Sequence, residues 1–202
     1  MLGLLVALAG GCASKTQGEK TVESYSHTRE TLSASRRQVA LTTSSLTSLR
    51  TTPPGAMKDA FRRYRDAVGQ LEKEAADSKW RAQAMQEQSD AHIQAWKEEM
   101  SSIKDPTIKA SVESRRDAVG TNFSLIRMYA DDVRKAYEPF LQGNKDMVQA
   151  LSLDISPAAI NSLSAGIDKV VASGKALDDK LWSMEHAMDN VANGKSPLGG
   201  TP

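Results

Sequence analysis

The sequence predicts an all-α protein, an elongated antiparallel helical bundle in which four long helices form a coiled coil. Apolar residues recur at alternating steps of four and three over long stretches, and prolines divide these stretches at three short breaks. Aromatic residues make up only 5% of the chain, so the apolar positions hold mainly Ala, Val, Leu, Ile and Met. A spacing that averages about 3.5 residues keeps the apolar seam on one side of a supercoiled helix.

The breaks set the expected boundaries of the helices. They are TTPPG at 51–55, KDPT at 104–107 and LDISP at 153–157. The helices between them are expected at about 21–50, 56–103, 107–153 and 157–192. Ser156 and Pro157 form a good cap and first turn for the last helix, and Pro139 is expected to kink the third. Because the connections are short, neighbouring helices should be antiparallel.

Three of the four helices have a regular seam. In the second helix the seam consists of Met57, Phe61, Tyr64, Val68, Leu71, Ala75, Ser78, Ala82, Met85, Ser89, His92 and Trp96. In the third it consists of Ile108, Val112, Arg115, Val119, Asn122, Ile126, Tyr129, Val133, Ala136 and Phe140. In the fourth it consists of Ile160, Leu163, Ile167, Val170, Gly174, Leu177, Leu181, Met184, Met188 and Val191. These spacings favour helices over strands.

The first helix has a weaker pattern. Its apolar residues Tyr25, Leu32, Val39 and Leu46 stand seven apart, and its end reads LTTSSLTSLRTT. Because Ser and Thr side chains compete for backbone hydrogen bonds, we expect this end to fray.

Helix lengths predict the shape of the molecule. The second helix should be roughly 70 Å long, so the protein must be elongated. The first and fourth helices are shorter and meet the same end, near Pro53 and Pro157. The opposite end, around 104–107, should therefore project as a tip made of two helices.

This tip is rich in apolar residues. They are Ile93, Trp96, Met100, Ile103, Ile108 and Val112. One interpretation is that these side chains close the hairpin on itself. The other is a docking surface for a partner protein, a second copy of the chain or lipid headgroups.

Cys12, the only cysteine in the chain, cannot form an intramolecular disulfide. It follows a short apolar run, 2–9, that is too brief to span a bilayer, and the sequence Ala9-Gly10-Gly11-Cys12 resembles a bacterial lipobox. We therefore predict lipid attachment at Cys12. The expected organisation is a signal peptide at 1–11, a lipid-anchored flexible tether at 12–20, a single helical domain at 21–192 and a disordered tail at 193–202.

Two alternatives remain open for the N-terminal segment. Ala7-Leu8-Ala9 is a pattern that a general signal peptidase could use, which would release a soluble periplasmic protein. The segment could also stay unprocessed as a helix. If Cys12 is acylated, two or three acyl chains would hold the protein stably. The residue after the lipidated cysteine is Asp in lipoproteins that are retained in the inner membrane. Here that residue is Ala13, which favours a location of the mature protein on the inner leaflet of the outer membrane, facing the periplasm.

The composition argues against several other classes of protein. The formal charge is +1 with mixed signs along the chain, so no basic face for nucleic acid is expected. His27, His92 and His186 are far apart, and the adjacent pair Asp131 and Asp132 should diverge on a helix. Ser101 and Lys104 match S-x-x-K without its supporting motifs. We predict no metal site, no cofactor and no enzymatic activity.

Five short motifs resemble a bacterial lipoprotein family catalogued as a domain of unknown function, of the DUF2959 type. They are WKEEM at 96–100, SRR at 114–116, AYEPFL at 136–141, LSL at 151–153 and AINSL at 159–163. The resemblance implies a helical, coiled-coil envelope protein whose third helix continues through Pro139. It implies no established activity and supplies no catalytic residues.

Two functions are expected from these observations. The first is a structural or protein-interaction module of the cell envelope, with an envelope protein or a second copy of the chain as partner. The second is a carrier that binds an apolar ligand between the third and fourth helices, motivated by Ala136, Gly174, Met184 and Met188.

Overall fold

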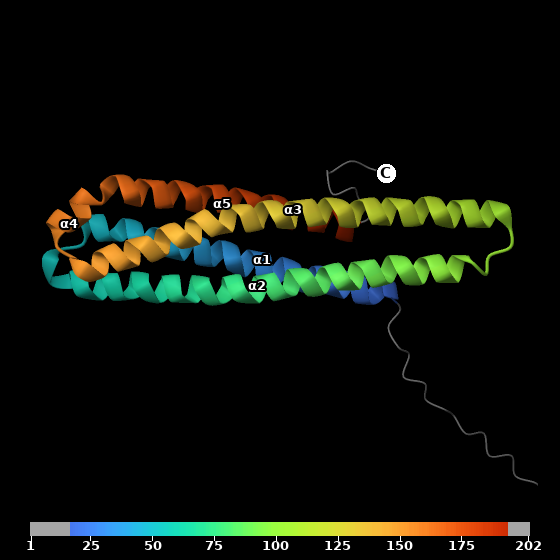
Figure 1. Ribbon diagram of the computed structural model, residues 1–202, viewed down its shortest axis with the longest axis horizontal. Coiled ribbons are helices and arrows are strands. Elements are labelled where there is room, and N and C mark those ends of the chain that lie inside the picture. The colour runs from blue at the N-terminus through green and yellow to red at the C-terminus, as the bar shows by residue number, and fades with distance from the viewer. Residues whose placement is uncertain (1–16, 194–202) are drawn as a thin grey trace, which may run out of the picture.

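The computed structural model describes residues 17–193, except for the side chains of 17–26, 78–82, 85 and 192. It is all-α and elongated (Figure 1). The long helices are α1 (Gln17–Ser48), α2 (Met57–Met100), α3 (Pro106–Leu153) and α5 (Ser164–Ala192). The short elements are η1 (Leu49–Thr51), η2 (Pro54–Ala56) and α4 (Pro157–Ser162). The predicted fold class is confirmed.

The four long helices form an antiparallel ring in which α1 packs against α2 and α5, and α3 packs against the same two helices. Ion pairs fix the register. Arg29 of α1 pairs with Asp189 near the end of α5 at 2.8 Å, and Arg50 of η1, which follows α1, pairs with Asp168 near the start of α5 at 2.6 Å. Lys180 pairs with Asp132 at 3.0 Å and joins α5 to α3. Neighbouring helices are therefore antiparallel, as the short connections predict.

The predicted seams form the core. Every described seam side chain of α2, α4 and α5 is buried or half-buried, and the same holds for α3 with two exceptions. Ile108 and Arg115, both predicted in the seam, are exposed. They lie where α3 has only α2 beside it, so no third or fourth helix covers them. The 3.5-residue spacing thus predicts which face turns inward, and the number of neighbouring helices decides how deeply it is buried.

The two-helix tip is confirmed. Figure 1 shows α2 and α3 continuing past both the start of α1 and the end of α5. The Gln38 side chain donates a hydrogen bond to the Ala67 carbonyl at 2.7 Å, so in antiparallel register Gln17 lies beside the region of Gln88. Beyond that point α2 runs on to Met100, about 18 Å further at 1.5 Å per residue.

Helix α3 continues through Pro139, as the family resemblance implies. Proline lacks the N–H that would bond to the carbonyl of Lys135 four residues earlier. Both residues lie on the exposed side of α3, where water can satisfy that carbonyl. The lost hydrogen bond is therefore tolerated and the helix is not ended.

The predicted fraying of the first helix is wrong. α1 is helical to Ser48, and a short 3-10 turn follows it. The hydroxyls of Thr42, Thr47 and Ser48 donate to carbonyls one turn back, at 2.8 Å each, instead of unravelling the helix. Leu46 and Leu49 are fully buried in the same segment, so tertiary packing outweighs the low helix propensity.

Two boundaries also differ from prediction. α1 begins at Gln17, so 17–20 lie in the helix and not in the predicted tether. The expected helix at 157–192 is interrupted at Leu163, which separates α4 from α5. Ser156 caps α4 as predicted, accepting a hydrogen bond from the Ala159 N–H at 3.2 Å. At the interruption Arg50 of η1 donates to the Ser164 carbonyl at 2.8 Å, which holds the bend against η1.

Two helical glycines give a matched test of the packing. A Cβ at Gly174 would lie 2.7 Å from Thr43 Oγ1 and 2.8 Å from Phe140 Cε2, whereas a Cβ at Gly69 would have nothing within 4 Å. We expect Gly174→Ala to lower the free energy of unfolding by about 1–2 kcal/mol through overpacking. Gly69→Ala should raise it by up to about 1 kcal/mol, because alanine is the better helix former. Urea unfolding of both variants tests this, and equal effects would contradict the close packing at Gly174.

Candidate functional site

Three places are candidates for function: the predicted lipid attachment point, the two-helix tip and a groove along the bundle. Cys12 lies outside the described residues. The nearest described residue is Gln17, the first of α1. Figure 1 shows that α1 begins on the side of the bundle that faces the two-helix tip, and not at the end where η1 and α4 lie.

The structure brings the predicted tip residues together and gives them different exposures. Met100 is buried, with 4% of its surface exposed, and Ile93 packs against the core. Trp96, Ile103 and Val112 are half-buried. Ile108 is 57% exposed. Part of the apolar surface thus closes the hairpin, and part of it faces outward.

An aromatic cluster joins the two helices at the base of the tip. The His92 ring meets Trp96 edge-on at a centroid distance of 5.6 Å and Phe123 of α3 at 6.0 Å. Such edge-to-face contacts are favourable beyond simple burial. They fix the spacing of α2 and α3 where the other two helices end. His92 therefore packs in the seam and lies among rings.

The turn at the end of the tip is tightly hydrogen-bonded. Asp105 caps α3 by accepting hydrogen bonds from the backbone N–H groups of Thr107 and Ile108, at 2.9 and 3.0 Å. Pro106 occupies the first position of the helix. Lys104 and Lys109, on either side of this cap, are exposed. The tip therefore presents a rigid turn with one apolar side chain, Ile108, between two lysines.

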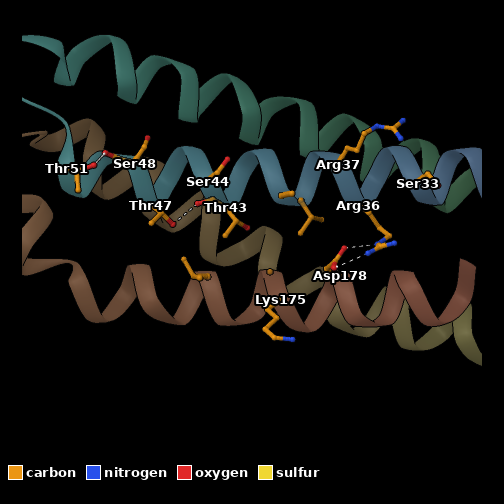
Figure 2. Close-up of a pocket in the computed structure, with 14 residues that line it drawn as sticks. Ser33, Arg36, Arg37, Thr43, Ser44, Thr47, Ser48, Thr51, Lys175 and Asp178 are labelled. Atoms are coloured by element: carbon orange, nitrogen blue, oxygen red, sulfur yellow. Dashed lines mark hydrogen bonds and ion pairs between the residues drawn. The ribbon is translucent and has the colours of Figure 1, made fainter. Parts of the chain in front are cut away.

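A shallow groove of about 930 Å³ runs along the outside of the bundle between α1 and α5 (Figure 2). It exists because α1 carries small side chains along this face, so the helix surface does not fill the space beside α5. The lining side chains from α1 and η1 are Ser33, Arg36, Arg37, Val39, Ala40, Thr43, Ser44, Thr47, Ser48 and Thr51. Those from α5 are Val171, Gly174, Lys175 and Asp178.

Three charged residues of the groove, Arg36, Lys175 and Asp178, are already in ion pairs. Arg36 donates to Asp178 through Nε at 2.8 Å and to Glu185 through Nη1 at 3.1 Å. The hydrogen bond to Asp178 is the main reason that the pKa of Arg36 is raised above its normal value. Lys175 points away from α1 in Figure 2 and pairs with Asp179 at 2.9 Å. The Arg36 pairs join α1 to α5 and shape the end of the groove, whereas the Lys175 pair lies within α5.

The hydroxyls of the groove are mostly engaged with their own helix. Ser44, Thr47 and Ser48 each donate to a carbonyl one turn back, at 2.8–3.0 Å. Thr43 Oγ1 differs, since it is buried without a hydrogen-bond partner beside Gly174. A hydroxyl bonded to its own backbone is not activated as a nucleophile, which needs an adjacent general base. Ser33, at the end of the groove, instead donates its hydroxyl hydrogen bond to the Glu185 carboxylate. The groove as a whole offers a surface for contact.

The space predicted between the third and fourth helices is filled. Met184 and Met188 are buried in the core, and Gly174 accommodates the ring of Phe140. The groove lies on the other flank of α5, beside α1. Small residues thus occur both where α5 packs closely against α3 and where an open groove separates α5 from α1.

The polar core contains a pair that the sequence analysis missed. Tyr64 of α2 donates to Asn144 Oδ1 of α3 at 2.9 Å, and Asn144 Nδ2 donates to the Phe140 carbonyl at 2.8 Å. Both Tyr64 and Asn144 are fully buried. Burial raises the pKa of Tyr64, so the hydroxyl stays protonated as a donor. The alternating pattern places the next seam position at Gly143, whereas a second successive step of four brings Asn144 into the core, so the regular spacing does not identify it.

The remaining predicted groups do not converge. Among the residues whose side chains the structure describes, no three His, Cys, Asp or Glu residues lie close enough together to hold a metal ion. Asp131 and Asp132 diverge as predicted: the first bonds to Arg134 at 3.2 Å and the second to Lys180 at 3.0 Å. Among the described residues, no helix is both long and apolar enough to cross a membrane.

The fold places this chain among elongated all-α proteins built on an antiparallel four-helix bundle with a projecting hairpin. A family model described as "Protein of unknown function (DUF2959)" matches residues 14–193. The chain belongs to this family. No curated protein and no solved structure matches the chain.

Proposed function

We propose that the protein is a lipoprotein of the bacterial cell envelope, attached through Cys12 to the periplasmic face of the outer membrane, where it acts as a structural or protein-interaction rod. The observation that carries this proposal is the position of Cys12. The lone cysteine follows Ala9-Gly10-Gly11 after a short apolar run, and only four residues separate it from α1. A lipid at this position would tie the bundle closely to a membrane.

The architecture supports a role in contact. A rod with a projecting hairpin exposes a large side surface and a distinct end (Figure 1). Several large apolar side chains remain exposed along it, among them Leu41, Met128 and Trp182. Trp182 stacks on His186 at a centroid distance of 5.0 Å and so presents a broad, flat surface on α5. Exposed aromatic surface of this kind is typical of protein contacts.

A second candidate function is carriage of an apolar ligand. The observation that favours it is the α1–α5 groove, which is lined mainly by small and aliphatic side chains and has the volume of a small-molecule site. The ligand would lie along α1 beside Gly174, and not between α3 and α5.

Separation of the two membranes followed by native mass spectrometry tests both functions. Under our proposal the protein sediments with the outer membrane and, when extracted gently, carries a stoichiometric protein partner or a second copy of itself. A stoichiometric small molecule, lost when Ala40→Leu at an exposed lining position narrows the groove, would favour the carrier instead. Recovery in the soluble periplasmic fraction would contradict the anchor.

A further inference from the structure

The tether length and the start of α1 restrict how the rod can meet a membrane. Five residue steps separate Cys12 from Gln17. A fully extended chain covers at most about 17 Å in five steps. α1 is 32 residues long, or about 48 Å, and it runs from Gln17 toward the end where η1 and α4 lie. The tether is therefore too short for that end to face the membrane that holds Cys12.

The opposite end is within reach. The two-helix tip extends about 18 Å past the start of α1, as the register of Gln38 with Ala67 places it. This distance matches the reach of the tether. A rod attached through Cys12 and standing with its tip toward the membrane would thus bring the turn between α2 and α3 to the membrane surface.

The surface of the tip fits the headgroup region of a bilayer. Ile108 is 57% exposed, Ile103 is half-buried beside it, and Lys104 and Lys109 are exposed around them. Apolar side chains at the boundary of the acyl chains, with lysines at the level of the phosphates, are typical of interfacial segments. The cap formed by Asp105 holds the turn rigid, so Ile108 is already positioned for insertion.

We propose that the two-helix tip rests in the headgroup region of the bilayer that holds the Cys12 lipid, with Ile108 inserted and Lys104 and Lys109 at the phosphates. This inference depends on the proposed lipidation and adds an orientation to it. The protein then contacts the membrane at two places, the lipid anchor and the tip. The end near Pro53 points away from the membrane and is left free for a partner.

The test compares two single-cysteine probes on the full chain. Ile108→Cys labels the tip, and Leu153→Cys labels an 86% exposed apolar position at the opposite end of α3. In the lipidated protein the Cys12 sulfur is a thioether, so a thiol-reactive fluorophore reacts only with the introduced cysteine. Each labelled protein is reconstituted in vesicles of phosphatidylethanolamine and phosphatidylglycerol that contain nitroxide-labelled headgroups.

We expect the nitroxide to quench the probe at position 108 several-fold more than the probe at position 153. Equal quenching at both positions, on protein whose mass includes acyl chains, would overturn the placement of the tip and leave the anchor intact. A mass without acyl chains would overturn the anchor and the placement together. Because both positions are exposed, neither substitution should unfold the protein, and circular dichroism checks this.

Discussion

Replacing Asn144 by alanine is expected to lower the free energy of unfolding by about 3 kcal/mol. The amide lies fully buried between α2 and α3, where it accepts from the Tyr64 hydroxyl and donates to the Phe140 carbonyl. The substitution removes two hydrogen bonds, each worth about 1 kcal/mol, and leaves a cavity. It also leaves Tyr64 with only the longer contact, 3.3 Å, to the backbone carbonyl of residue 144. Denaturant unfolding of the two proteins measures the difference.

The control for this prediction lies two residues away. Gln142 is exposed and donates only to Asp146, so Gln142→Ala should change the free energy of unfolding by less than about 0.5 kcal/mol. Tyr64→Phe and Asn144→Ala each remove the same hydrogen bond. Together they should therefore lower the free energy of unfolding by less than the sum of their separate effects. Additive effects of the two substitutions would contradict the view that this pair stabilises the contact between α2 and α3.

Replacing Cys12 by serine is expected to release the protein from the membrane fraction. A serine hydroxyl cannot form the thioether that carries the diacylglycerol, and two or three acyl chains supply the binding energy of the anchor at about 0.8 kcal/mol per buried CH₂. The variant should therefore move from the membrane pellet to the soluble or unprocessed pool. Fractionation of cells, with an alkaline wash of the pellet, measures this.

Ser14→Ala is the matched control, since it changes a neighbouring small polar residue and leaves the cysteine in place. It should stay with the membrane as the native chain does. A Cys12→Ser protein of mature length that remained in the washed pellet would show that another part of the molecule holds it there.

The predictable part of the fold follows from periodicity. Met57, Leu71, Ile167 and Leu181 occupy seam positions and are all buried, because a 3.5-residue repeat turns the same face inward along the whole helix. The projecting tip followed from helix lengths and the proline breaks alone. Helix lengths and break positions depend only on local sequence and on the rise per residue, so the sequence of one chain is enough to predict them.

The unpredicted part depends on contacts between distant segments. The Ser/Thr-rich end of α1 is helical because Leu46 and Leu49 are buried by the rest of the bundle, which propensity alone does not reveal. The groove depends on which flank of α5 meets α1. In the sequence, the small residues that line it are compatible both with a close helix contact and with an open groove, so they do not predict which one forms. Ile108 shows the converse, since it lies in the seam yet has no third helix to cover it.

The mass of the mature protein, purified intact from its own envelope, decides whether Cys12 carries a lipid. We predict a chain that begins at Cys12 and is heavier than its amino-acid sequence by a diacylglycerol group and, when fully processed, a third acyl chain. A chain that begins at Gly10 and carries no lipid would contradict the anchor.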